Sequence, residues 1–423
     1  MRRFGCLLHL AGKSAWNRRG TLALIVFSIA LSTTLLLGIE KLRTQIRESF
    51  AQSVSGTDLV VGARGGNIQL MLYAIFHLGG ATSNMGWDSA QAIAQRDDVA
   101  WTIPISLGDS HQGHPVVATT DDFFEHYRFR AGRQIELAAG ERPAGLFDVV
   151  LGAETAGKLG YSLGQKIILS HGSSGARLAE HDDKPFTVTG ILAPTGTPVD
   201  HSLYIGLHAM EALHINWRGG VPLPGMRVTP EQAARFNLEP KSITALLVGL
   251  KKRGRVFALQ REINEWKAEP LMGVMPGVAM DQIWSMVAVG ERALLLISAL
   301  VTVTGLAGLA AAILAGLGER RRELAILRSV GARPLDILLL PAFEGVLLVV
   351  TGVLAGLSIL YALLAFLGPV LADSYGIFIQ PSPPSAGEWA LLGGIVAAGV
   401  PASLIPALRA YRMSLADGLA VST

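Results

Sequence analysis

One segment of the sequence has the glycine and lysine spacing of a phosphate-binding loop, which holds nucleotide phosphates in many ATPases. Residues 152–159 read GAETAGKL and follow an apolar run. A loop of this kind needs serine or threonine after the lysine, because that hydroxyl ligates Mg²⁺. Leu159 follows Lys158 here and cannot ligate the ion. We therefore expect no nucleotide to bind at this segment.

A second segment could supply a nucleophile. Ser173 and Ser174 stand in the sequence HGSSGA, where glycines flank the serines as they do in some hydrolases. A nucleophilic serine needs a base within hydrogen-bond distance, and no spacing in the sequence indicates one. The surrounding residues are polar and rich in turn formers, so we expect a solvated hairpin loop and no catalytic site. Enzymatic activity at Lys158 or Ser174 stays as an alternative hypothesis.

Ten histidines are the candidate metal ligands. His111 with His114, and His208 with His214, are close enough in sequence to chelate an ion on some backbones. No carboxylates accompany either pair at a fixed spacing, so we expect exposed or hydrogen-bonded histidines and no metal site. Cys6 is the only cysteine, which excludes an intrachain disulfide and a cysteine-based zinc cluster.

Composition indicates that these segments belong to a membrane protein. Half of the 423 residues are hydrophobic, only 16% are charged, and the mean hydropathy is +0.41. A water-soluble globular protein rarely has this balance. The net charge of +3 is small, and the arginines gather in a few short segments instead of alternating with aromatic residues. We therefore expect no nucleic acid partner.

Four apolar runs are long enough to cross the roughly 30 Å hydrocarbon core of a bilayer as helices. They cover residues 20–39, 293–318, 337–372 and 389–408. The third run is longer than one crossing requires, so we expect either an extension beyond the membrane or a break near Pro369. Its only charged residue is Glu344, and Trp389 opens the fourth run as a candidate interfacial anchor.

Arginine and lysine set the expected orientation of these helices. They are frequent in residues 1–19, 319–336 and 409–423, and absent from the short loop 373–388. By the positive-inside rule, both termini and segment 319–336 are cytoplasmic, while residues 40–292 and 373–388 are external. The first span is too long for a cleaved signal peptide and lacks a clear cleavage site, so we interpret it as an anchor.

Residues 40–292 are predicted to form a mixed α/β domain between two stalk helices. Apolar residues recur every four positions at 42–54, and a matching segment with Ile283, Met286, Val287 and Gly290 leads into the second span. Short β-branched runs predict strands at 59–63, 99–106, 115–119, 147–151, 166–170, 186–192, 203–205 and 243–250. Helical patterns occur at 87–96, 154–159, 207–214 and 255–267. These elements indicate one external domain of one or two lobes.

Segment 319–336, between the second and third spans, predicts a short amphipathic helix. Leu324, Leu327 and Val330 recur at helical spacing, while charged residues occupy the other faces. Gly331 is a natural C-terminal stop, and Pro334 opposes continuation. Such a helix can seat its apolar side chains in a partner's groove and fix its register with charged pairs.

This segment, with the residues after it, closely resembles the signature of the MacB/FtsX-type permeases of type VII ABC transporters. The resemblance lies in the order of ERRRELAILRSVGARPLDI followed by Glu344 and Gly345. It implies that the short helix docks on a separate ATPase subunit, which binds ATP and Mg²⁺. The implied coupling residues are Glu319, Arg320, Arg321, Arg322, Glu323, Leu324, Leu327, Arg328 and Gly331. Glu344, an acid near the cytoplasmic end of its span, is expected to support this helix.

The resemblance extends along most of the chain. DLVVGARGGNIQLML, VLGAETAGKLGYSLGQK and VTGILAPTGTPVDHSLYIGL are similar to parts of MacB-type periplasmic domains, and IPALRAYRMSLADGL is similar to the ending of these permeases. MacB carries an ATPase domain ahead of its first span, and this sequence begins with only 19 residues there. We therefore expect the split form, in which the ATPase is a separate polypeptide.

The resemblance implies a permease that transmits ATPase movement across the inner membrane of a Gram-negative cell to a periplasmic domain. The expected assembly is a homodimer in membrane lipid with two ATPase subunits, joined by a periplasmic adaptor or substrate protein. Export and lipoprotein or envelope substrate handling are the expected outputs. Regulation of an envelope hydrolase, as in the FtsX branch, is the alternative, although FtsX-like proteins usually have a smaller external domain.

Overall fold

The structure is a computed structural model of the chain, and its residues separate into two compact units. It describes residues 19–52, 56–80, 83–129, 132–172, 179–218, 221–223, 227–319, 326, 329, 331, 333–375 and 382–412. The helical unit comprises Met1–Gln45 and Ala288–Thr423, and the sheet unit comprises Ile46–Val287.

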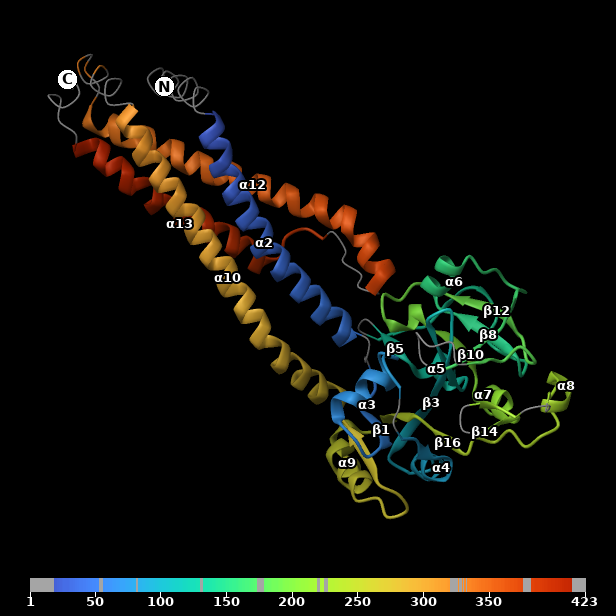
Figure 1. Ribbon diagram of the computed structural model, residues 1–423. Coiled ribbons are helices and arrows are strands. Elements are labelled where there is room, and N and C mark those ends of the chain that lie inside the picture. The colour runs from blue at the N-terminus through green and yellow to red at the C-terminus, as the bar shows by residue number, and fades with distance from the viewer. Residues whose placement is uncertain are drawn as a thin grey trace. The chain divides into compact units, whose positions relative to one another are not determined.

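The sheet unit is built on one long mixed sheet (Figure 1). Within the described residues this sheet has 12 strands, and its main path runs in the order β18-β1-β17-β3-β4-β13-β8-β12-β7. Strands β12 and β8, and β13 and β4, pair in parallel, while the other pairs on this path are antiparallel. Three two-stranded pairs, β14 with β15, β16 with β2 and β5 with β6, stand apart from this sheet. The described strands of the sheet unit, these pairs included, are β1 (Leu59–Ala63), β2 (Met85–Gly86), β3 (Val99–His111), β4 (His114–Thr119), β5 (Arg128–Phe129), β6 (Arg133–Gln134), β7 (Leu137–Gly140), β8 (Asp148–Leu151), β9 (Lys166–Ile167), β10 (Ser170–His171), β11 (Ala179–Glu180), β12 (Phe186–Leu192), β13 (Leu203–Gly206), β14 (Trp217–Arg218), β15 (Val221–Pro222), β16 (Ser242–Ile243), β17 (Ala245–Leu250) and β18 (Leu271–Val274).

Both faces of this sheet are buried, because helices cover each side. Successive side chains of β1 point to opposite faces, so Leu59 and Val61 enter one core while Val60 enters the other. The first core includes residues of α4 (Trp87–Ala94), α6 (Ala153–Leu159), α7 (Leu207–His214) and α9 (Val256–Asn264). The second includes residues of α3 (Asn67–Ala74) and α5 (Asp122–His126). Three further short helices described in the sheet unit are η1 (Pro198–His201), α8 (Pro230–Ala233) and η2 (Arg253–Arg255).

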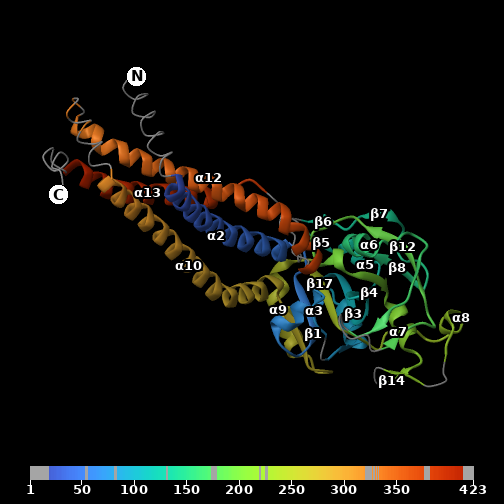
Figure 2. The same cartoon turned by 45° about the horizontal axis from the view of Figure 1, so that its top comes forward.

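In the part of the chain that the structure describes, the helical unit contains four long helices, which run alongside one another in both views (Figures 1 and 2). They are α2 (Arg19–Gln52), α10 (Pro276–Glu319), α12 (Pro334–Tyr375) and α13 (Ala386–Arg412). Each contains a stretch long and apolar enough to cross a membrane: Arg19–Gln45, Pro276–Gly316, Ile337–Gly368 and Ala386–Arg409. Leucine, isoleucine and valine side chains from all four helices form their shared core.

The predicted fold class, four membrane helices with a large mixed α/β domain, is confirmed. Helix α12 continues through Pro369 to Tyr375, so the long third run extends and does not break. The two cores lie on opposite faces of one sheet, and Ile46–Val287 forms one compact unit. Predicted strand 99–106 is longer, since β3 reaches His111, and predicted strand 166–170 divides into β9 and β10.

Ile263 tests the packing of α9 on the sheet. Its side chain is fully buried, and its methyl group faces Gly273 of β18. Ile263→Ala leaves a cavity and is expected to destabilise the sheet unit by about 2–5 kcal/mol. The measurement is thermal unfolding of the detergent-solubilised chain. Phe257→Ala is the control on the same helix, because Phe257 is 69% exposed; equal effects of the two variants would contradict this packing.

Candidate functional site

A group of polar residues joins three helices of the helical unit. We call Lys41, Tyr361, Ser382 and Glu388 the polar clip. The Nζ of Lys41 donates a hydrogen bond to the backbone oxygen of Ser382 at 2.7 Å and lies 3.7 Å from Glu388 Oε2. The Tyr361 hydroxyl donates to the same backbone oxygen at 2.7 Å, and the Tyr361 ring centroid lies 5.5 Å from Lys41 Nζ. The clip therefore connects α2, α12 and the start of α13.

Both charges of the clip are buried, with the side chains of Lys41 and Glu388 only 4% and 7% exposed. A buried charge is costly unless it is paired and hydrogen-bonded. Glu388 is also fixed by the helix it begins: its Oε2 accepts from the Ser385 backbone N–H at 2.8 Å, and its own N–H donates to Ser385 Oγ at 3.2 Å. This reciprocal capping box holds the carboxylate where Lys41 can reach it.

Glycines allow the helices of the helical unit to approach closely. A Cβ atom on Gly356 of α12 would lie 2.5 Å from the backbone oxygen of Ala30 in α2, and one on Gly345 would lie 2.3 Å from Ser403 Oγ in α13. Thr34 Oγ1 donates to the backbone oxygens of both Ala30 and Gly356, at 2.8 and 2.9 Å. Small residues and such hydroxyl contacts are typical of helix interfaces in membranes.

A second charged contact joins α2 to α10. Arg43 donates to Glu40 Oε1 at 2.6 Å within α2, and it lies 3.9 Å from Glu291 Oε2 of α10. Arg43 lies within the first predicted stalk segment and Glu291 directly follows the second, and the side chains at 46–55 lie outside the described residues. The contact between Arg43 and Glu291 is therefore a charged link between α2 and α10, in addition to the hydrogen bond from Ser32 Oγ to the backbone oxygen of Val301 at 3.4 Å.

Most of the predicted coupling residues lie outside the residues that the structure describes: Arg320, Arg321, Arg322, Glu323, Leu324, Leu327 and Arg328. Glu319 is the last residue of α10, and the described residues Ile326 and Ser329 are helical. Gly331 has a φ of +94°, as expected of a glycine that ends a helix. Glu344 lies half-buried in α12, within its apolar stretch. Its predicted supporting role stays a prediction.

The segment with phosphate-loop spacing has a structural role in the sheet unit. Lys158 Nζ lies 2.7 Å from Glu154 Oε1 within α6, and Glu154 Oε2 lies 2.9 Å from His201 Nε2. Burial opposes the charged form of Glu154, yet His201 and Lys158 together hold the pKa of this carboxyl below its ordinary value. A Cβ on Gly152 would lie 2.4 Å from the backbone oxygen of Asp200, so close packing explains this glycine. Ser173 and Ser174 lie outside the described residues.

The histidine pairs suggested by the sequence do not form sites together. His111 contacts the backbone oxygen of Ile168 at 2.6 Å and the Tyr161 hydroxyl at 2.8 Å. His114 contacts the backbone oxygen of His201 at 2.9 Å. His208 is exposed on α7, whereas His214 ends that helix and lies beside Asp109, His171 and His181. The sequence interpretation missed this group because its members are far apart in the chain.

The architecture defines a class of protein: a multi-pass membrane protein with a large mixed α/β domain outside the bilayer. The MacB-like periplasmic core domain model matches residues 20–265, and the FtsX-like permease C-terminal model matches residues 295–415. The chain therefore belongs to the MacB/FtsX-type permeases of ABC transporters. Permeases of this type work with an ATPase partner.

Solved structures give looser similarities. The periplasmic region of MacB from Actinobacillus actinomycetemcomitans is 10% identical, with a TM-score of 0.34 over 56% of this chain and 96% of that one. The extracellular domain of the noncanonic ABC-type transporter YknZ from Gram-positive bacteria is 8% identical, with a TM-score of 0.31 over 52% and 99%. These superpositions are too loose to support an argument, so the family assignment depends on the family models. A search of curated proteins gives no significant match.

Gly356 tests the close contact between α2 and α12. Gly356→Ala places a methyl group against the Ala30 backbone, and we expect it to lower the stability of the helical unit by about 1–3 kcal/mol. The measurement is the thermal transition of the purified chain in detergent. Gly393→Ala on α13 is the control, since its added Cβ meets no atom within 4 Å. A control variant as unstable as Gly356→Ala would refute the contact.

The polar clip gives a second prediction. Lys41→Met leaves the buried Glu388 carboxylate without its cation, which is expected to cost about 3–5 kcal/mol. Adding Glu388→Gln should recover part of this loss, because the uncompensated charge is then removed. Thermal transitions of the single and double variants measure the coupling. Arg43→Met should have the smaller effect, since Arg43 is 35% exposed; a Lys41→Met transition no lower than that of Arg43→Met would contradict the prediction.

Proposed function

We propose that this chain is the permease subunit of a type VII ABC transporter whose ATPase is a separate polypeptide. In this proposal two permease chains form a homodimer with two ATPase subunits, which bind ATP and Mg²⁺. Closure of the ATPase subunits moves segment 319–336 in each permease. The helices carry this movement across the membrane, and the sheet unit delivers it to an adaptor or substrate protein.

The continuity of α10 is the observation that carries this proposal. Near its start, Ala279 and Met280 are buried in a core of the sheet unit. Its last residue, Glu319, is the first residue of the predicted coupling segment. The helix has 44 residues, or roughly 66 Å at 1.5 Å per residue, which is about twice the hydrocarbon thickness. One hydrogen-bonded element thus links the proposed ATPase contact to the sheet unit.

The polar clip supports a transmission role, because it ties α2 to α12 and α13. In the described part of the helical unit, the hydroxyls of Ser32, Thr33 and Thr34 donate to backbone oxygens of α2 itself. These groups are already satisfied and need no hydrophilic substrate beside them. We therefore propose that substrate does not pass between these helices. Transport of a solute by the permease and its ATPase alone, without an external partner, would overturn this mechanism.

The proposed location is the inner membrane of a Gram-negative cell, with both termini and segment 319–336 in the cytoplasm. The support is the distribution of arginine and lysine in residues 1–19, 319–336 and 409–423. The sheet unit then lies in the periplasm. Export and lipoprotein or envelope substrate handling are the outputs that we propose.

Affinity purification of the detergent-solubilised chain from its native host tests the assembly. We expect a soluble ATPase in stoichiometric amount, identified by mass spectrometry. Crosslinking through the sheet unit then identifies the output: an adaptor or lipoprotein supports export or release, whereas a cell-wall hydrolase supports the FtsX-like alternative. Purification without any ATPase would contradict the proposed coupling.

The coupling segment gives a direct prediction. Ala325→Pro is expected to disrupt the predicted helix, because proline in a helix interior costs about 3 kcal/mol. Charge reversal by Arg321→Glu or Glu323→Lys should have the same result, because it removes the charged pairs that are proposed to fix the position of the helix on the ATPase. We expect normal membrane insertion but loss of permease-dependent stimulation of ATP hydrolysis. Ala325→Ser, which keeps a small side chain that a helix tolerates, is the control. Normal stimulation in Ala325→Pro would count against this docking site.

A further inference from the structure

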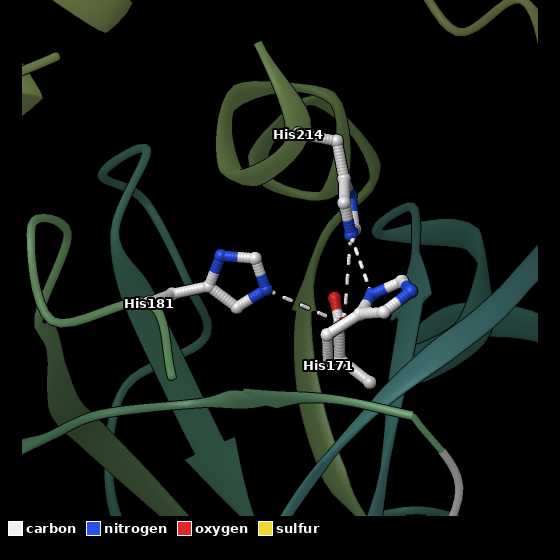
Figure 3. Close-up of side chains that lie close together, drawn as sticks. His171, His181 and His214 are labelled. Carbon is white, nitrogen blue, oxygen red and sulfur yellow. Dashed lines mark hydrogen bonds and ion pairs between the residues drawn. The ribbon is translucent and has the colours of Figure 1, made fainter. Parts of the chain in front are cut away.

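Four side chains from separate segments of the sheet unit converge on one point. Asp109 lies in β3, His171 in β10, His181 directly after β11, and His214 at the end of α7. Figure 3 shows the three imidazole rings pointing toward one another from different elements. One ligand atom from each of the four residues can be chosen so that all lie within 4.8 Å of one another.

The distances match those between ligands of one small metal ion. His171 Nδ1 lies 3.0 Å from Asp109 Oδ1 and 3.1 Å from His214 Nε2. His181 Nε2 and His214 Nε2 each lie 3.5 Å from the same carboxylate oxygen. With zinc–ligand bonds of about 2.0–2.1 Å, two ligands of a tetrahedral site are about 3.3 Å apart. The present spacing therefore requires only small movements to surround an ion.

The backbone explains why these residues meet. Asp109 and His171 are directly opposite each other in the antiparallel pair of β3 and β10. The pairing of β3 with β4 shifts register between Leu107 and Asp109, a bulge that can re-aim the side chains that follow it. His181 follows β11, which pairs with β10, and α7 brings His214 over the same end of β3.

A hydrogen bond to the backbone fixes the orientation of the His214 ring, with Nε2 on the side of the cluster. Its Nδ1 lies 2.9 Å from the backbone oxygen of Met210, so this nitrogen carries a proton and donates to that oxygen. In the tautomer with its proton on Nδ1, the lone pair of Nε2 points into the cluster, where His171 Nδ1 lies 3.1 Å away. Metal-binding histidines commonly hold their second nitrogen in this way, which fixes both tautomer and ring orientation.

Protein hydrogen bonds alone do not satisfy this cluster. Within the described residues, three buried atoms of the cluster have no hydrogen-bond partner: both ring nitrogens of His181 and Oδ2 of Asp109. His181 is 1% exposed and Asp109 is 3% exposed, so water has little access to these atoms. Buried polar atoms without partners are rare in proteins and suggest a bound group. An ion between the rings and the carboxylate would satisfy His181 Nε2.

Surrounding residues hold the cluster in place. The Trp217 ring lies against His181, with centroids 4.2 Å apart, and its centroid is 5.1 Å from that of His171. The buried Lys184 Nζ donates to Asp183 Oδ2 and Asn216 Oδ1, both at 2.8 Å. Asn216 Nδ2 donates to Asp183 Oδ2 at 3.0 Å. This triad ties the segment after His181 to the segment after His214, and such outer contacts orient metal ligands.

We propose that Asp109, His171, His181 and His214 bind one divalent transition-metal ion, with Zn²⁺ as the best fit to the donor set. Three imidazole nitrogens and one carboxylate oxygen are borderline ligands that suit Zn²⁺ better than the all-oxygen-binding Ca²⁺ or Mg²⁺. Four protein ligands fill a tetrahedral shell and leave no position for a reacting water. The ion would thus cross-link β3, β10, the segment after β11 and α7, independently of the proposed transport function.

The test uses the full-length chain in detergent, stripped with a chelator and titrated with Zn²⁺ against a chromophoric competitor. We expect one tightly bound equivalent per chain and a higher thermal transition of the sheet unit when Zn²⁺ is present. Substitution by Co²⁺ should give the strong visible absorption of a four-coordinate ion. The proposal would be overturned if the folded wild-type chain bound no Zn²⁺ in competition with the chelator. This outcome does not depend on the behaviour of any variant.

Variants assign the ion to these residues. His181→Gln and Asp109→Asn should weaken Zn²⁺ binding by more than about tenfold, since loss of even an outer partner costs that much at metal sites. His171→Gln is a further variant. His171 is only half-buried, so this substitution is less apt to prevent folding. His208→Gln is the matched control, because His208 is exposed on the same helix as His214. Unchanged affinity in folded His171→Gln, or equal loss in His208→Gln, would place the ion elsewhere and reject the site.

Discussion

Backbone and charged groups cannot remain unpaired in the interior of a bilayer, and this constraint shapes the helical unit. The chain crosses as hydrogen-bonded helices, and the hydroxyls of Ser32, Thr33 and Thr34 donate to backbone oxygens of their own helix. Lys41 is acceptable among apolar neighbours because Glu388 and the Ser382 carbonyl meet its charge. Gly356 lets α2 and α12 approach closely enough for Thr34 to bond to both helices. The contact between α2 and α12 thus provides both close helix packing and a hydrogen-bond acceptor for a buried hydroxyl.

The constraint on the sheet unit is different: both faces of its long sheet carry apolar side chains, which must be shielded from water. Helices α4, α6, α7 and α9 cover one face, and α3 and α5 cover the other. Helix α10 adds Ala279 and Met280 to the second core before it enters its apolar stretch. A movement of α10 would therefore act on buried side chains of the sheet unit, as the proposed transmission requires.

The cluster of Asp109 and three histidines illustrates how local motifs can mislead. GAETAGKL has the spacing of a nucleotide loop, but Lys158 pairs with Glu154 in its own helix. The sequence pairs His111 with His114, yet each finds separate hydrogen-bond partners. The group with unsatisfied buried atoms is assembled from residues 109, 171, 181 and 214, which no short motif connects. Strand pairing and a bulge bring it together.

The sequence by itself determined the four apolar helices, the mixed α/β class, several elements such as β1, β12 and α7, and the family. These features follow from local hydrophobic periodicity, span length and an ordered motif, which need no knowledge of distant contacts. Tertiary structure alone decided that α12 continues through Pro369, that Lys41 pairs with Glu388, and that His214 joins Asp109. Those outcomes depend on residues far apart in the chain, whose proximity is set by packing and strand register, not by any local pattern.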